Sequence, residues 1–244
     1  MAFVSEQCDT ELDDSPANVP VWAVYMTAFR FFGALTEKPR TIIYIDGFNL
    51  YYGAVKDTPY KWLDLARFFR LVRPNDDIQR IRYFTAMVHG PWKPNQDVYL
   101  QALATTPDVQ VILGKFKNKK IKCAVPRCTY SGTRFFQASE EKRTDVNIAI
   151  FMLDDAYQDL CDNLVLVSGD SDLVPVVRMI RHRFPTKETT VYVPARDPGR
   201  GAAVELRMAA DRNRDLPLNV LPHAQFSNPL PDGYGGFLQK PASW

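Results

Sequence analysis

Four aspartates stand where strand-like segments end or where a helix-like segment begins. Asp46 follows one apolar run, Asp170 and Asp172 follow another, and Asp145 opens a helical pattern. Carboxylates that lie close together repel one another, and a divalent cation such as Mg²⁺ or Mn²⁺ offsets this repulsion in an all-oxygen site. These residues therefore predict a metal-dependent enzyme that acts on phosphodiesters.

The elements that must position these aspartates follow from hydrophobic periodicity. From Thr41 onward, β-branched and aromatic runs alternate with longer helical patterns, which predicts βαβ units and a mainly parallel α/β sheet. We expect strands at residues 41–45, 78–88, 109–116, 163–168 and 188–194, with helices between them and a final helix over 202–216. With strand order 3-2-1-4-5, the first and fourth strands are neighbours, and Asp46 lies beside Asp170 at the switch point.

Each acidic turn also has a simpler explanation. Asp46 or Asn49 alone could cap the helix that follows, and so could Ser171 or Asp172. A cap needs only one side chain, however, and two carboxylates with interleaved serines exceed that need. We expect Asn49 to orient a water molecule or the substrate beside the carboxylates.

Asp145 lies early in a helix whose apolar residues face the core, so we expect its side chain near the sheet. Asp154 and Asp155 lie elsewhere around that helix, and we expect both to be surface charges. Glu141 and Lys142 precede the helix and could supply a further ligand and a phosphate contact. Their pattern favours solvated charges at the helix entry.

Composition indicates one main domain. The 244 residues are 46% hydrophobic and 24% charged, with a formal net charge of +2, which neither requires nor excludes a polyanionic partner. We expect an N-terminal extension over 1–40, the main domain over 41–216 and an irregular Pro- and Gly-rich tail over 217–244.

The N-terminal residues do not indicate secretion or membrane insertion. Acidic residues begin the chain, unlike a signal peptide, and the interrupted apolar run Val19–Leu35 is too short to cross a bilayer comfortably. We expect this run to form a helix docked on the main domain, with initiation near Met26 as the alternative. Four cysteines make no disulfide framework, so we expect a cytoplasmic protein.

A basic insertion over residues 115–143 contains nine basic and two acidic residues with aromatic residues interleaved. Lysines and aromatic rings on a flexible loop suit single-stranded RNA, because cations bind phosphates and rings stack on bases. The alternative is a solvated hairpin whose aromatic side chains turn into the core. The candidate RNA-binding residues are Lys117, Lys119, Lys120, Lys122, Lys142 and Arg143.

The insertion also contains Cys123 and Cys128, spaced like half of a zinc site. No second pair of ligands lies near them in the sequence, so we expect reduced thiols. A zinc ion shared across a homodimer is the alternative. His89, His182 and His223 are isolated and give little support to nucleophilic catalysis with a histidine base.

Three motifs carry a resemblance to a known family. The sequence resembles the NYN family of PIN-like nucleases in YIDGFNL at 44–50, KRTDV at 142–146 and VSGDSDL at 167–173, with a match from about Thr41 to Leu216. The resemblance implies a PIN-like, Rossmann-like three-layer fold. It also implies an acidic metal site made by Asp46, Asp145, Asp170 and Asp172, with Asn49 beside it.

Two other functions stay open. The sequence also resembles NYN-type proteins identified as 6-hydroxy-3-succinoylpyridine 3-monooxygenases, which implies NADH as reductant and a small pyridine substrate of nicotine degradation. Residues 199–204 begin like a dinucleotide-binding fingerprint but lack its third glycine and its place after the first strand. A catalytically silent RNA-binding regulatory module is the third hypothesis, against which the complete acidic set argues.

Overall fold

The computed structural model describes residues 37–126, 128–196 and 203–244. The chain divides into Met1–Glu37 and Lys38–Trp244, and only the second unit is described here. The helix predicted over Val19–Leu35 lies outside the described residues. So do residues 199–202 of the fingerprint-like segment.

A six-stranded parallel sheet forms the centre of the unit, in the order β3-β2-β1-β6-β7-β8. The five predicted strands occupy the predicted order, and the order reverses between β1 and β6. The functional edge of such a sheet lies at the carboxyl ends of the strands flanking the reversal. The strands are β1 (Arg40–Asp46), β2 (Asp77–Thr85), β3 (Val109–Leu113), β6 (Asn163–Val167), β7 (Glu188–Val193) and β8 (Arg212–Asp215).

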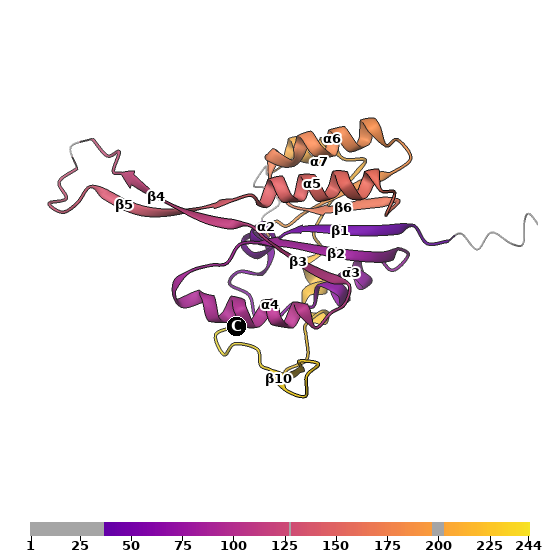
Figure 1. Ribbon diagram of the computed structural model, residues 1–244, viewed down its shortest axis with the longest axis horizontal. Helices are drawn as coiled ribbons and strands as arrows, with labels where there is room; N and C mark the ends of the chain where they lie inside the picture. The colour runs from indigo at the N-terminus through magenta and orange to yellow at the C-terminus, as the bar shows by residue number, and fades with distance from the viewer. Residues whose placement is uncertain (1–36, 127, 197–202) are drawn as a thin grey trace, which may run out of the picture. The chain divides into compact units, whose positions relative to one another are not determined.

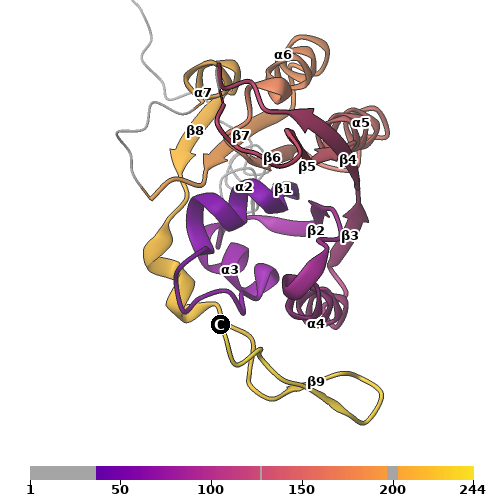
Figure 2. The same ribbon diagram turned by 90° about the vertical axis from the view of Figure 1, so that its left-hand side faces the viewer.

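Helices cover both faces of the sheet, as Figure 2 shows. Helices α3 (Leu65–Val72) and α4 (Lys93–Ala104) lie on one face. The other face carries α5 (Thr144–Tyr157), α6 (Val174–Arg183) and α7 (Val204–Ala209). Successive residues of β1 enter separate apolar cores, because side chains alternate across a strand. This is the predicted three-layer α/β fold.

Two predictions about secondary structure were wrong. The last predicted helix, over 202–216, ends as α7 at Ala209, and the chain then forms the edge strand β8. The predicted flexible loop in the basic insertion is an antiparallel hairpin of β4 (Lys115–Lys122) and β5 (Phe135–Lys142), which extends away from the sheet (Figure 1).

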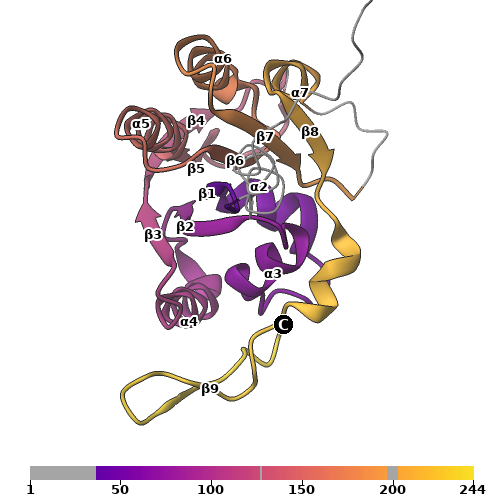
Figure 3. The same ribbon diagram turned by 90° about the vertical axis from the view of Figure 1, so that its right-hand side faces the viewer.

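The tail after β8 packs against the α3 and α4 face, as Figure 3 shows. It contains a 3-10 segment, η4 (Leu218–His223), and two short strands, β9 (Leu230–Pro231) and β10 (Phe237–Leu238). Trp244 contacts the rings of Trp62 and Tyr99 with centroid distances of 6.4 and 5.7 Å. Part of the predicted irregular tail thus packs on the core, in which Leu221, Ala224 and Phe226 are buried. Within the described residues, no helix combines the length and apolarity that a membrane span needs.

A short helix, α2 (Gly47–Leu50), and a π-helical segment, η1 (Tyr51–Val55), follow β1 directly. Gly53 allows η1 to approach the end of β7, because a Cβ atom there would lie 1.9 Å from the carbonyl oxygen of Pro194. The close approach of these two backbones fixes the position of the segment that leaves the carboxyl end of β1.

We expect Gly53→Ala to lower the free energy of unfolding by about 3 kcal/mol, because the added methyl group must displace backbone. Urea denaturation measures the loss. Gly236→Ala is the matched control: its Cβ would meet the side-chain Oδ2 of Asp232 at 2.5 Å, and a side-chain end can move aside. Equal losses of unfolding free energy in both variants would contradict the close contact between the backbones at Gly53 and Pro194.

Candidate active site at the carboxyl edge of the sheet

Asp46 ends β1 and is almost fully buried, with 3% of its surface exposed. Its Oδ1 accepts hydrogen bonds from the backbone N–H groups of Phe48 and Asn49, so it caps α2 as the simpler explanation required. Its Oδ2 also accepts bonds from Asn49 Nδ2 at 2.5 Å and Ser168 Oγ at 3.2 Å. Burial raises the pKa of Asp46, the hydrogen bonds lower it, and the charge of Asp170 adds to the rise.

The loop after β6 is tied to the turn after β1. Asn49 Oδ1 accepts a hydrogen bond from the Gly169 N–H at 3.1 Å. Ser168 Oγ accepts one from the Asp170 N–H at 3.1 Å, and Asp170 Oδ1 in turn caps the following turn through the Asp172 N–H at 2.9 Å. The two predicted neighbours at the switch point therefore meet through a serine and an asparagine. Asp172 points to a more exposed position.

The beginning of α5 brings a third carboxylate to this edge. Asp145 is half-buried, and burial together with the charges of Asp170 and Asp46 raises its pKa to about 6. Glu141, at the end of β5, has its pKa raised to about 7, chiefly by burial. It accepts a hydrogen bond from the Thr144 hydroxyl, and the charges of Asp46 and Asp145 add to its shift.

Glu141 is the site residue that sequence reasoning undervalued, because it was expected to be a solvated charge. It shares a face of the hairpin with Phe116, its cross-strand partner. The Phe116 ring in turn contacts the Phe48 ring beside Asp46, at a centroid distance of 5.7 Å. An alternating pattern along 135–142 would have placed Glu141 on the same side as Phe135, but no apolar alternation marks this strand.

The donor set suits a hard divalent cation. Asp46, Asp145, Asp170 and Asp172 offer carboxylate oxygens, and the charges of the other three aspartates all raise the pKa of Asp145, which indicates an excess of negative charge. Across residues 37–126, 128–196 and 203–244, however, no three ligand-type side chains stand close enough together to hold an ion. The residue types therefore fit a divalent metal, but their side chains are not arranged as a complete coordination site.

The basic residues predicted to bind RNA lie along the hairpin and at its base. The two faces of the ribbon carry different sets, because cross-strand partners share a face. Lys120 and Lys122 pair with Gln137 and Phe135 on the face that leads to Glu141. The opposite face carries Lys117 and Lys119.

Glu140 reduces the charge of the face that carries Lys117 and Lys119. Glu140 forms ion pairs with Lys119 and Lys142, which hold its pKa well below the usual range. Arg143 is exposed and takes a left-handed conformation, with φ of 81°, at the junction with α5. The aromatic side chains of the hairpin do not fill the core as the alternative supposed: Phe135 and Phe136 are 54% and 53% exposed.

Asp155 was predicted to be a surface charge, and that prediction was wrong. It is fully buried and forms an ion pair with Arg82, with 2.5 Å between Nη2 and Oδ1. Tyr44 donates a hydrogen bond to its Oδ2 at 2.7 Å. Asp154, by contrast, is exposed as expected. Cys123 and Cys128 are free thiols, and among the described residues no further ligands gather around them.

A cavity of about 410 Å³ opens beside Asp46, on the face covered by α3 and α4. Gly47 and Phe48, which directly follow Asp46, form part of its wall. Gly47 leaves room for Tyr83, because a Cβ atom there would lie 2.8 Å from the tyrosine hydroxyl oxygen. Sequence reasoning missed this cavity, since its wall comes from three parts of the chain that are distant in sequence, within 47–63, within 83–99 and at Trp244.

Three matches to known proteins place the chain among its relatives. The profile of the NYN domain matches residues 40–217. The chain is 33% identical to 6-hydroxy-3-succinoylpyridine 3-monooxygenase of Pseudomonas putida, with 74% of this chain and 67% of that protein covered. A solved structure of a protein of unknown function from Vibrio parahaemolyticus is 20% identical in sequence, with a TM-score of 0.47. The match covers 74% of this chain and 94% of the Vibrio chain.

Proposed function

The chain belongs to the NYN domain family, within the PIN-like nuclease superfamily, and from this premise we propose that it is a divalent-metal-dependent ribonuclease acting on single-stranded RNA. One observation carries the proposal: at the carboxyl edge of the sheet, the charges of Asp170 and Asp46 raise the pKa of Asp145, and the charge of Asp170 raises the pKa of Asp46. An excess of buried negative charge costs stability, and it is useful where a cation binds.

The proposed roles follow from position. Asp46, Asp145, Asp170 and Asp172 would hold Mg²⁺ or Mn²⁺, which supplies an activated water molecule and stabilises charge on the phosphate oxygens. Asn49 holds the Asp46 carboxylate and the Gly169 backbone in place. Glu141, with a pKa of about 7, is suited to exchange a proton near neutral pH.

The hairpin supplies the proposed path for the RNA strand. Its face with Lys120, Lys122 and Phe135 leads along the ribbon to Glu141 and the acidic residues. Phosphates require cations and unstacked bases require exposed rings, and this face provides both. Lys117 and Lys119 lie on the opposite face, where Glu140 reduces the net charge.

We expect the double substitution Lys120→Glu and Lys122→Glu to raise the KM for single-stranded RNA at least tenfold, because two phosphate contacts become repulsive. Cleavage of a labelled RNA at several salt concentrations measures this, and the salt dependence should become weaker. Lys117→Glu with Lys119→Glu is the matched control, equal in charge change but on the other face. If the control variant loses as much as the test variant, the binding face is assigned wrongly.

The function itself is tested with purified protein and a labelled single-stranded RNA. Cleavage that needs Mn²⁺, stops on addition of EDTA and returns with excess Mn²⁺ would support a metal-dependent nuclease. RNA binding without cleavage under any divalent cation would point to the regulatory module. Double-stranded RNA of the same sequence shows whether the substrate must be single-stranded.

A second candidate function is an NADH-dependent 6-hydroxy-3-succinoylpyridine 3-monooxygenase. The identity of 33% to the Pseudomonas putida enzyme of that name favours it, as does the aromatic cavity beside Asp46. Substrate-dependent oxidation of NADH, with formation of the hydroxylated product in the absence of RNA cleavage, would establish this activity instead. Both assays are run on the same preparation, so that each result is a control for the other.

A further inference from the structure

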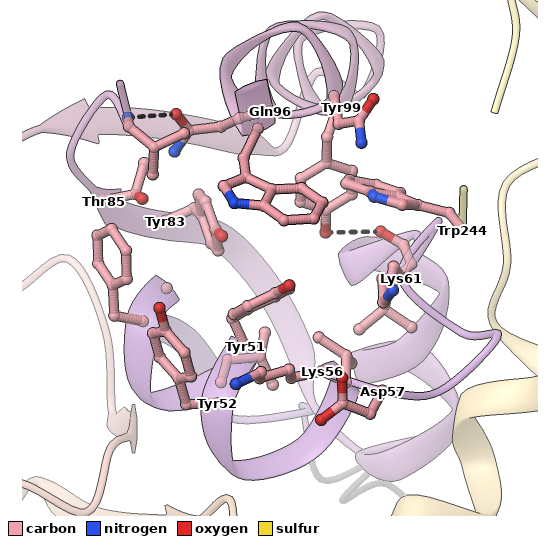
Figure 4. Close-up of a pocket in the computed structure, with 18 residues that line it drawn as sticks. Tyr51, Tyr52, Lys56, Asp57, Lys61, Tyr83, Thr85, Gln96, Tyr99 and Trp244 are labelled. Carbon is pink, nitrogen blue, oxygen red and sulfur yellow. Dashed lines mark hydrogen bonds between the residues drawn. The ribbon is translucent and has the colours of Figure 1, made fainter. Parts of the chain in front are cut away.

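The cavity beside Asp46 has seven aromatic residues among the eighteen that line it. Its wall comes from η1 on one side and α4 on the other, with β2 between them, as Figure 4 shows through Tyr51, Tyr99 and Tyr83. A volume of about 410 Å³ falls in the range of small-molecule sites. The aromatic residues are Phe48, Tyr51, Tyr52, Tyr83, Trp92, Tyr99 and Trp244.

Flat rings at these positions favour a flat ligand. Tyr52 is 59% exposed at the rim of the cavity. The Tyr99 hydroxyl is already bonded to the Leu63 carbonyl oxygen at 2.9 Å, and Gln96 is bonded to backbone groups of Val88 and Ala86. These bonds hold the Tyr99 and Gln96 side chains in the wall of the cavity. Stacking and edge-to-face contacts are the interactions that such walls offer.

Two lysines give the cavity a positive rim. Lys56 lies over the Tyr52 ring, with Nζ 5.2 Å from the centroid, and Lys61 also lines the cavity (Figure 4). Among the described residues, neither lysine forms an ion pair. Asp57, on the same rim, has a left-handed conformation with φ of 60°. Two lysines against one aspartate leave a net positive charge, which favours an anionic group at the rim.

The cavity also adjoins the acidic edge. Gly47 and Phe48 line it and directly follow Asp46 in the chain. Tyr83 lines it too, and its pKa is raised by burial and by the charge of Asp46. The cavity therefore borders the turn that Asp46 caps, and none of the proposed metal ligands lines it.

We propose that this cavity binds a planar heteroaromatic ring joined to an anionic group. The ring would stack among the tyrosine and tryptophan side chains, and the anion would pair with Lys56 and Lys61. Two sources share this chemistry: a nucleoside monophosphate, as one unit of an RNA strand, and a hydroxypyridine that carries a succinoyl carboxylate. The proposal stands apart from the nuclease proposal, because ring binding needs neither metal nor cleavage.

Isothermal titration calorimetry of the full chain in EDTA tests the proposal. The probes are adenosine and uridine monophosphates and 6-hydroxy-3-succinoylpyridine, with ribose 5-phosphate and succinate as ring-free controls. Saturable binding of a monophosphate or of the pyridine, with at least tenfold weaker binding of the controls, is the expected result. The probe that binds identifies the source of the ligand.

Variants locate the binding site. Tyr52→Ala and Lys56→Met should each weaken binding at least tenfold, and both positions are open enough for the fold to tolerate the change. Lys93→Met is the control, since Lys93 lies on α4 outside the cavity and pairs with Asp97. Absence of binding by both probe types, equal binding of the ring-free controls, or unchanged binding in both test variants would each overturn the proposal. Loss of RNA cleavage alone would not.

Discussion

Asp145→Asn is expected to reduce metal-dependent RNA cleavage by about a thousandfold or more, because it removes a charged oxygen donor from the proposed site. The same variant should make the metal-free protein slightly more stable. Activity falls while the stability of the metal-free protein rises, because the charged Asp145 carboxylate destabilises the fold unless a cation is bound. Substitution of a residue with a purely structural role would not lower activity while raising stability.

The direction of the stability change follows from the pKa. Asp145 has a pKa of about 6 in the folded protein against 3.8 as its ordinary value, so the folded state binds the proton more tightly. Its charged form therefore destabilises the metal-free fold at pH 7.5, and stability rises as the pH falls through 6 toward 4. Asparagine removes this cost. A backbone hydrogen bond lowers the pKa of Asp145 but does not reverse the rise.

The size of the stability change is small. A shift of about two pKa units corresponds to about 3 kcal/mol, and solvent screening at this half-exposed position reduces it to about 1 kcal/mol. For a chain of this length, that is an increase in Tm of about 2–4 °C. Differential scanning calorimetry in EDTA and in Mn²⁺ measures both states. Wild-type protein should gain stability with Mn²⁺, and the variant should gain less.

Asp154→Asn is the control, because Asp154 lies on the same helix but is exposed. It should keep cleavage and the Mn²⁺ effect. Asp145 is a cleaner test position than Asp46, whose oxygens accept four hydrogen bonds and cap α2. Cleavage that survives in Asp145→Asn, or a Tm that falls in EDTA, would remove Asp145 from the proposed metal site.

The sequence predicted the central sheet because its strands are continuous apolar runs. Strand β1 is RTIIYID, buried along almost its whole length, and β6 is NLVLV, buried throughout. Such runs bounded by polar residues are typical of parallel strands covered on both faces. The positions of Asp46 and Asp170 followed from their order alone, since strand ends beside a switch point converge.

The missed elements lack that pattern. Strand β8 reads RNRD and all four of its residues are exposed, so only its backbone pairing with β7 makes it a strand. Strand β4 reads KFKNKKIK, in which lysines occupy both faces, and its partner begins thirteen residues further along. Pairing between backbones is invisible to a search for apolar periodicity. The charge-rich segment of β4 was therefore interpreted first as a loop, with a solvated hairpin as the alternative.

The candidate site was predicted in part for a similar reason. Glu141 and Asp155 are charged residues whose environments depend on contacts with distant segments. Asp155 meets Arg82 from β2, and half-buried Glu141 lies at the end of β5 opposite Phe116 of β4. From its position on a helix alone, a charged residue is expected to be exposed to solvent. Its burial can be predicted only when its partner in the tertiary structure is known.

Asp155→Asn is expected to lower the free energy of unfolding by about 3–5 kcal/mol, because it leaves a buried guanidinium without its counter-charge. Arg82 is 4% exposed and donates to both Asp155 oxygens, with Nε 2.9 Å from Oδ2. The pair joins the C-terminal part of α5 to β2, about three turns along the helix from Asp145. Because Asp145 lies on the same helix, a displacement of α5 should also disturb the proposed metal site.

A double substitution separates the charge from the packing. Arg82→Met combined with Asp155→Leu removes both buried charges and should recover most of the stability lost in Asp155→Asn, as measured by urea denaturation. Asp108→Asn is the control, since Asp108 pairs with Arg70 at the surface and should cost less than about 1 kcal/mol. If Asp155→Asn costs no more than Asp108→Asn, the ion pair does not fix α5 to the sheet. The position of Asp145 would then depend on apolar packing and on the junction of the hairpin with α5.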